Sequence, residues 1–172
     1  MNMRNVNIVA RYESKLLRRD IVFLGFVVIA LVGISLWQMI KQGRVNVFWY
    51  KVALPSSFPF FSMYYYNLVQ VLIALFVCME VVYRERKKDA MEVFLCRPFR
   101  NSEYCIGRFL GIFRMFLFVN ICVLLVCMYI NLWVVGAPFN VWIYVFYLFT
   151  LSIPTLIFVL GCALSISAMV KN

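Results

Sequence analysis

The order of apolar and polar residues along the chain predicts four long helices that are apolar on every side. Apolar runs with only two charged residues, Glu80 and Arg114, occupy residues 21–40, 60–82, 109–135 and 141–170. An α-helix rises about 1.5 Å per residue, so about 20 residues cross the roughly 30 Å of hydrocarbon in a bilayer. A chain of 172 residues cannot hide four such helices from water. The pattern predicts an all-α, polytopic membrane bundle with four transmembrane helices, so that residues 21–172 form one transmembrane domain.

The segment before the first run has the period of an amphipathic helix. Five apolar residues share one side of a helical wheel: Val6, Val9, Tyr12, Leu16 and Leu17. Four basic residues share the other side, Arg4, Arg11, Lys15 and Arg18, with Glu13 and Ile8 as exceptions. A basic amphipathic helix lies in the membrane interface with its cations among anionic headgroups. Residues 1–20 are therefore expected to form a cytoplasmic interfacial helix, and an unordered basic tail is the alternative.

Composition agrees with a membrane protein and excludes soluble enzyme folds. Hydrophobic residues make up 65% of the chain and charged residues 14%, against about half and a quarter in soluble domains. The net charge of +10 would suit a nucleic acid, but the basic residues flank the apolar runs instead of clustering on a soluble face. We therefore expect membrane lipid, and no nucleic acid, as a partner.

The distribution of Lys and Arg predicts the orientation of the spans. Thirteen of these residues lie before span one, between spans two and three, or after span four, and three lie between spans one and two. The positive-inside rule then places both ends of the chain in the cytoplasm. The fourth run stops directly at Asn172, and we expect the sequence to be the N-terminal part of a longer protein.

Catalytic and metal-binding chemistry is not indicated. The chain has no histidine, and its six cysteines lie in predicted spans or on the predicted cytoplasmic side. Neither a disulfide framework nor a zinc site is expected from this pattern. The sequence also lacks a GxSxG nucleophile motif and a Walker A phosphate-binding motif. We therefore expect no catalytic residue, metal or cofactor in this chain, and we do not expect it to be an enzyme.

The cytoplasmic loop at residues 83–108 contains signals for a short helix. Asp89 can accept hydrogen bonds from free N–H groups as a helix cap, and Glu92 three positions later completes a capping box. Pro98 lacks an N–H and disfavours helical geometry at Arg97, so the helix should end there. These signals predict a helix of about two turns over residues 89–97.

This short helix would carry an apolar patch. Met91, Phe94 and Leu95 project together at spacings of three and four. A two-turn helix is not stable alone in water, and its patch needs a cover. Either a protein partner covers it, or it packs on the cytoplasmic ends of the spans or in lipid. A second helix start follows at Asn101 or Ser102 and leads into span three.

The loop resembles the first cytoplasmic loop of exporter-type ABC transporter permeases, in the type-2 permease superfamily. Their pattern is roughly E-R-x-x-G-T-L-E-x-L-L-x-x-P, followed by a basic residue and later by G-K. The matching pairs in this chain are Glu85-Arg86, Met91-Glu92, Phe94-Leu95, Arg97-Pro98 and Gly107-Arg108. The departures are Asp89-Ala90 in place of Gly-Thr and Arg108 in place of Lys. The basic helix before span one and the small, Ser-rich end of span four add to the resemblance.

The resemblance implies a function and a set of partners. In such transporters the loop helix is the coupling helix, which docks on a separate ABC ATPase subunit that binds the ATP, and two permease copies or homologues enclose the path. The residues it assigns to this contact are Asp89, Met91, Glu92, Phe94, Leu95, Arg97 and Pro98. We therefore expect a permease subunit in a bacterial cytoplasmic membrane. The alternative is a four-span membrane scaffold or small channel without an ATPase partner.

The charged residues inside the spans suggest one contact between helices. Ionisable groups in hydrocarbon are costly unless they are paired. Glu80 lies at the cytoplasmic end of span two and Arg114 one to two turns into span three, so adjacent antiparallel helices could pair them. The alternative is a local pair of Glu80 with Arg84, while Arg114 reaches the headgroups.

Small and polar residues inside the spans are expected to serve helix packing. Gly107 and Gly111 form a small-xxx-small step. Asn67, Gln70 and Asn120 either line a path or form hydrogen bonds between helices, and helix bonding is the favoured interpretation. Pro154 marks a kink or packing device in span four.

Overall fold

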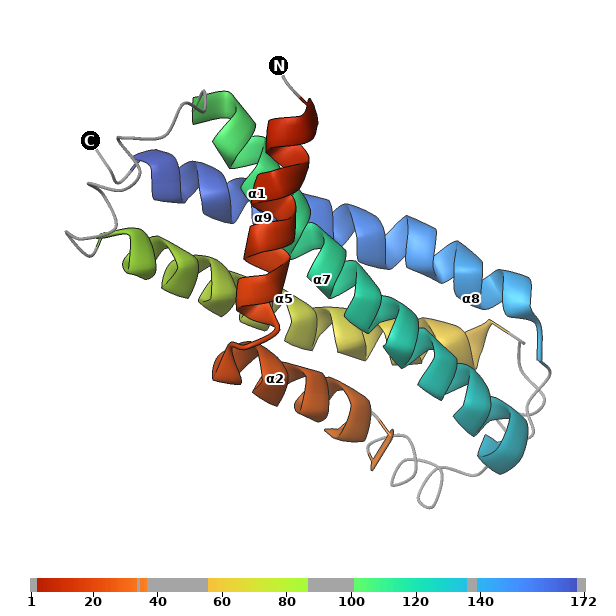
Figure 1. Cartoon of the computed structure of the whole chain (residues 1–172). Coiled ribbons are helices and arrows are strands. Elements are labelled where there is room, and N and C mark those ends of the chain that lie inside the picture. The colour runs from red at the N-terminus through yellow and green to blue at the C-terminus, as the bar shows by residue number, and fades with distance from the viewer. Residues whose placement is uncertain (1–2, 34, 37–55, 87–100, 136–138, 170–172) are drawn as a thin grey trace.

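The computed structural model of the chain describes residues 3–33, 35–36, 56–86, 101–135 and 139–169 (Figure 1). Within these residues every regular element is a helix, which confirms the all-α prediction. The α-helices are α1 (Met3–Leu17), α2 (Ile21–Val28), α5 (Ser57–Arg86), α7 (Asn101–Ile130), α8 (Val141–Tyr147) and α9 (Ile153–Met169). Three π-helical segments continue them: η1 (Ile29–Gly33), η2 (Asn131–Val135) and η3 (Leu148–Ser152).

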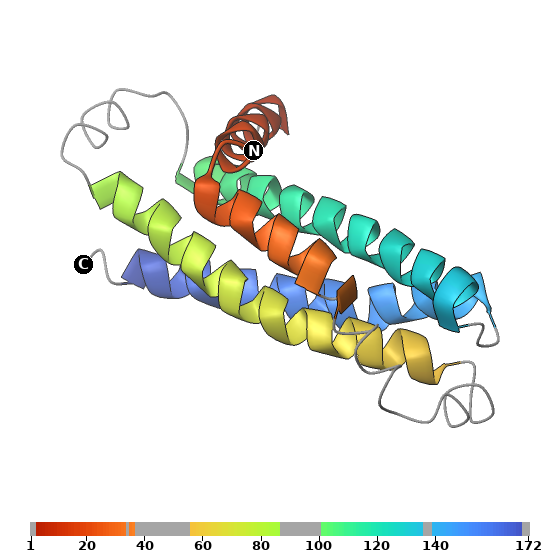
Figure 2. The same ribbon diagram turned by 90° about the horizontal axis from the view of Figure 1, so that it is seen from below.

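Four rods form the bundle, and α1 lies outside it. As Figures 1 and 2 show, α2 and α7 run in one direction. Helix α5 and the fourth rod, which consists of α8, η3 and α9, run in the other. The ends of α5 and α9 and the starts of α2 and α7 therefore lie at the same end of the bundle. Helix α1 crosses the first half of α7 at this end.

Three helical stretches are long and apolar enough to cross a bilayer. They are Phe58–Met79, Ser102–Trp133 and Val141–Ile166, and they correspond to the second, third and fourth predicted spans. The apolar helix Ile21–Gly33 is shorter. Of the first predicted span, at residues 21–40, residues 34 and 37–40 lie outside the described part of the chain.

The surface of these helices is apolar, as a lipid-facing surface must be. Trp142, Trp133 and Phe158 are between 71% and 79% exposed. Other large apolar side chains are exposed on every rod. A water-soluble protein of this size rarely exposes large contiguous apolar patches. Together with the three long helices, this surface indicates an integral membrane protein.

The core is built from the inward sides of all four rods. Phe116 of α7 packs edge-to-face on Phe23 of α2, with ring centroids 5.5 Å apart and planes at 79°. Its ring also lies 5.5 Å from that of Phe26. Aromatic rings at such separations contribute more than their buried area alone. This cluster packs α2 against α7 and positions the start of α2 beside α1.

Helix ends follow local chemistry, and two of them depart from the predicted spans. Helix α5 begins at Ser57, three residues before the predicted span, because Pro59 falls in its first turn, where no intrahelical N–H donor is needed. Helix α7 begins at Asn101, so the second helix of the loop and span three are one continuous rod. Asp20 caps α2, with its carboxylate 3.0 Å from the Val22 N–H.

The fourth rod contains a π-helical turn directly before Pro154. At the end of η3 the Ile153 N–H bonds to the Leu148 carbonyl, five residues back. Pro154 cannot donate to a preceding carbonyl, and a wider turn is one way in which a helix accommodates such a gap. The turn places Ser152, which is fully buried, toward α5.

Candidate functional site at the crossing of α1 and α7

The seven residues predicted to contact a partner ATPase lie outside the described residues, which lack 87–100. The predicted coupling helix at residues 89–97 therefore stays a prediction. The structure describes the two helices that carry this loop, α5 up to Arg86 and α7 from Asn101. The site that the described residues build nearest to the loop is the crossing of α1 and α7.

A pair of glycines brings the backbones of α1 and α7 into contact. A Cβ atom added at Gly107 would lie 2.7 Å from the Val9 Cβ and 2.8 Å from the Val6 carbonyl oxygen. A Cβ atom added at Gly111 would lie 2.8 Å from the Ala10 carbonyl oxygen. Side chains do not tolerate such distances, so only glycine permits this approach. The packing role predicted for this glycine pair is confirmed, and its partner is α1.

Polar bonds hold α1 in place at three levels of α7. Near the start, the Asn5 Nδ2 donates to the Glu103 Oε2 at 3.1 Å. In the middle, the Ser14 hydroxyl lies 2.8 Å from the Ala10 carbonyl oxygen and 3.1 Å from that of Gly111. Further along, the Arg114 Nη1 donates to the Asn7 Oδ1 at 3.1 Å.

The face that α1 buries differs in part from the apolar side predicted by the helical wheel. Five α1 residues are buried: Val6, Val9, Ala10, Glu13 and Leu17. Tyr12, which was placed on the apolar side, is 55% exposed, whereas Glu13, which was an exception, is only 8% exposed. The contact with the glycine pair selects short side chains and backbone, so the face that packs on α7 is centred on Val6 and Ala10 and not on Tyr12.

Charged residues are unusually buried around this crossing. Glu103 and Arg108 are each 5% exposed, although ionised groups are costly to bury unless they are paired. Asn5 supplies one hydrogen bond to Glu103, and the Arg108 guanidinium carbon lies 5.9 Å from the centroid of the Tyr104 ring. The first three turns of α7 thus combine two buried charged groups with the two glycines that contact α1.

Arg114 contacts α1, which the sequence did not predict. Its guanidinium bonds to Asn7 of α1. The alternative in which Arg114 reaches the headgroup region stays a prediction. The side chain of Glu80 lies outside the described set, so its predicted pair with Arg114 stays a prediction.

The three polar residues predicted to bond between helices behave in three different ways. Asn67 connects α5 to the fourth rod, because its Nδ2 donates to the Ser152 hydroxyl at 3.1 Å as well as to the Met63 carbonyl at 2.8 Å. Among the described residues, Asn120 bonds within its own helix, to the Phe116 carbonyl at 2.8 Å. Gln70 is 1% exposed, and neither of its polar atoms has a hydrogen-bond partner among the described residues.

One hydrogen bond between rods was missed by the sequence analysis. The Asn131 Nδ2 donates to the Tyr144 hydroxyl at 2.8 Å, and both side chains are fully buried. It joins η2 to α8 across the connection that contains residues 136–138. Both residues lie at the ends of apolar runs, and a buried amide or phenol needs a partner in lipid. That requirement is the signal that could have predicted the pair.

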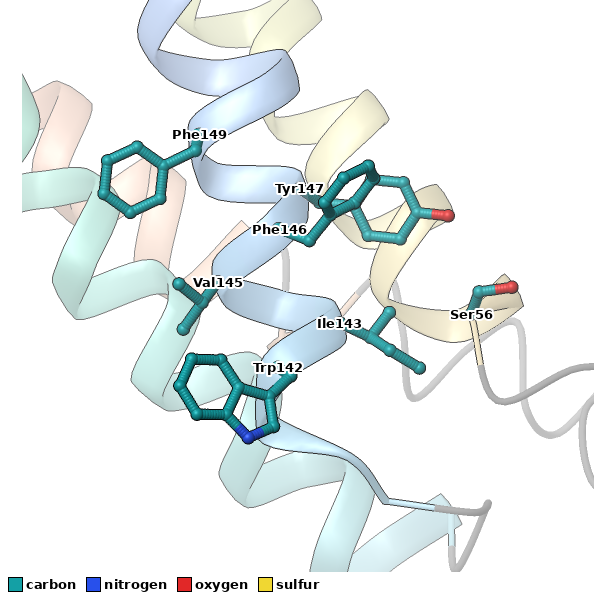
Figure 3. A pocket seen from close by; sticks show the side chains of 7 residues that line it. All are labelled: Ser56, Trp142, Ile143, Val145, Phe146, Tyr147 and Phe149. Atoms are coloured by element: carbon teal, nitrogen blue, oxygen red, sulfur yellow. The ribbon is translucent and has the colours of Figure 1, made fainter.

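A shallow groove on the fourth rod carries no polar chemistry. Its lining is Ser56, Trp142, Ile143, Val145, Phe146, Tyr147 and Phe149 (Figure 3). Figure 3 shows most of these side chains projecting outward from α8 and η3. Trp142, Phe146 and Phe149 are each at least 60% exposed. The groove is therefore a part of the lipid-facing surface that offers no charge to a polar ligand.

Comparison of the chain with protein-family models, curated proteins and solved structures found no match. The resemblance of the loop to ABC permeases therefore stays a hypothesis that rests on its own residues.

Proposed function

We propose that the chain is the permease subunit of an ATP-driven ABC transporter of the exporter type, in a bacterial cytoplasmic membrane. A separate ATPase subunit docks on the loop helix at residues 89–97, and two permease copies or homologues enclose the path. Substrate movement is coupled to ATP hydrolysis through this helix. ATP is bound only by the partner.

The observation that carries the proposal is the extension of α5, one of the two helices that hold the loop, beyond its candidate span. Helix α5 has 30 residues, or about 45 Å, against about 30 Å of hydrocarbon. The candidate span of α5 ends at Met79, and the helix continues to Arg86. This extension holds the loop away from the hydrocarbon, where a soluble subunit can reach it.

The crossing of α1 and α7 adds support for a coupling role. Helix α7 begins directly after the loop, and its first three turns touch the α1 backbone at the glycine pair. Close-packed contacts transmit displacement because they leave no free volume to absorb it. A shift of the loop helix would therefore move α7 and α1 together, and α2 follows α1 through the short turn at Arg18 and Arg19.

The test uses Phe94→Asp, with Lys87→Ala as its control. A carboxylate placed in a contact that excludes water costs several kcal/mol when it is unpaired. Removal of a solvated charge costs about 0 to 1 kcal/mol. Both variants, in the full-length protein, are tested for co-purification with the candidate ABC ATPase, and the ATPase rate is measured. Phe94→Asp should lose the ATPase while it still inserts into the membrane, and Lys87→Ala should behave like the parent.

Retention of the ATPase by Phe94→Asp, with an unchanged hydrolysis rate, would exclude docking through this helix. If neither the parent nor Lys87→Ala co-purified with an ATPase, the four-span scaffold or channel would be the better interpretation. Those two results separate the failure of the contact from the failure of the proposed function.

A further inference from the structure

The charges on the described surface have one sign. Six of the seven basic residues whose side chains are described are exposed: Arg4, Arg11, Lys15, Arg18, Arg19 and Arg114. All three acidic residues whose side chains are described, Glu13, Asp20 and Glu103, are buried. No described carboxylate is therefore exposed beside the exposed cations of α1. Like charges at this density favour an anionic partner.

Arg114 bonds to an amide of α1, and Arg11 starts one turn from that amide. Arg114 of α7 bonds to the Asn7 Oδ1 through Nη1, which leaves further N–H groups of its guanidinium for a second acceptor. Arg11 follows Asn7 by one turn of α1, so its Cβ starts about 5–6 Å from that of Asn7. Both arginines are exposed.

This pair lies at a boundary between α1 and the lipid-facing surface. Arg114 shares one side of α7 with Gly107 and Gly111, which α1 covers. Beyond Arg114 the same side continues as Phe118, Ile121 and Leu125, which are 63%, 43% and 58% exposed. A molecule bound at Arg11 and Arg114 would therefore have cations at its head and an apolar strip along its tail.

We propose that Arg11 and Arg114 bind the headgroup phosphate of an anionic phospholipid from the leaflet in which α1 lies. Guanidinium groups recognise phosphate oxygens through paired N–H donors. The acyl chains lie along Phe118, Ile121 and Leu125. A zwitterionic headgroup brings its own cation, which the exposed basic residues of α1 repel, whereas an anionic headgroup brings none. The site does not depend on an ATPase partner.

The test is native mass spectrometry of the delipidated full chain in detergent, titrated with phosphatidylglycerol or with phosphatidylcholine of the same acyl chains. The parent should retain phosphatidylglycerol more tightly. Loss of one charge-assisted hydrogen bond to the phosphate weakens binding about ten-fold. Arg11→Gln should therefore bind phosphatidylglycerol about ten-fold more weakly, and Arg11→Gln with Arg114→Gln about a hundred-fold more weakly.

Arg19→Gln is the matched control, because it removes the same charge from the turn after α1. Equal weakening by Arg19→Gln would show general surface attraction and would overturn the site, as would equal binding of the two lipids by the parent. Displacement of the lipid by millimolar inorganic phosphate would mean that a free anion, and not a lipid, is bound. Arg11 is exposed, so the single variant decides the test if the double variant does not fold.

Discussion

The crossing of α1 with α7 and the packing of α5 on the fourth rod are both contacts between helices, yet different forces hold them together. At the crossing, the glycine pair lets backbone touch backbone, and Asn5, Ser14 and Arg114 add hydrogen bonds around it. Between α5 and the fourth rod, side chains of ordinary size interlock, and Asn67 and Ser152 form one buried hydrogen bond.

The two contacts differ in the means of association that each uses. In lipid, apolar side chains gain little by leaving the bilayer, so close approach and polar bonds drive association. The crossing concentrates both devices in three turns. The interior of the bundle instead accepts a buried amide, Gln70, without a partner among the described residues. The first contact should therefore be sensitive to added volume, and the second to the exchange of polar groups for apolar ones.

The largest effect is expected for Gly111→Ala. The added methyl would lie 2.8 Å from both the Ala10 carbonyl oxygen and the Glu13 Cβ, and overpacking of this kind costs about 1–3 kcal/mol. Gly161→Ala is the control, because a Cβ there meets nothing within 4 Å, and alanine favours helix by up to about 1 kcal/mol. Thermal unfolding in detergent should show a lower midpoint for the first variant and an unchanged or higher one for the second. Equal unfolding midpoints for the two variants would contradict the close backbone contact at Gly111.

An effect of opposite sign and no larger size is expected for Gln70→Leu. An unpartnered buried polar group destabilises a protein by about 1–3 kcal/mol, so an apolar side chain of similar size should raise the unfolding midpoint. Asn67→Leu makes the same kind of change three residues earlier but removes two hydrogen bonds, and it should lower the midpoint. If both variants unfolded early, Gln70 would have a partner outside the described residues.

The smallest effect is expected for Ser152→Ala. Hydrogen bonds between membrane helices contribute about 0.6 kcal/mol on average, so loss of the bond to Asn67 should lower stability by about that amount. Among the described residues, the Ser165 hydroxyl bonds to the Gly161 carbonyl of its own helix, so Ser165→Ala tests the loss of a hydroxyl that joins no second helix. Denaturant titration of both variants in mixed micelles would compare them. A larger loss for Ser165→Ala would contradict the assigned contact.

The sequence predicted the helices because lipid imposes a simple rule on each of them. A span of about 20 apolar residues is recognisable without knowledge of its neighbours, and three of the four predicted spans coincide with long apolar helices. The start of α7 near Asn101 was also predicted from the sequence, because helix caps depend on adjacent residues alone.

Contacts between helices were less predictable, because they depend on rotation and depth that no local pattern encodes. The Gly107 and Gly111 spacing indicated close packing but not its partner, and nothing near Arg114 in sequence pointed to Asn7. The face of α1 was predicted with Tyr12 inside and Glu13 as an exception, since a helical wheel cannot distinguish lipid from a glycine-lined surface. The coupling helix itself lies outside the described residues.

The distance in sequence between α1 and α7 has a consequence for biosynthesis. Asn5 and Glu103 are 98 residues apart, and ribosomes add about 5–20 residues per second. Helix α1 therefore leaves the ribosome about 5–20 seconds before the α7 residues on which it packs. During that interval the apolar side chains of α1 need another surface to cover them, and the membrane surface can do so. The amphipathic pattern of α1 thus suits two successive contacts. The apolar side first lies on the bilayer surface while the chain is being synthesised, and it packs on α7 once the third predicted span has been made.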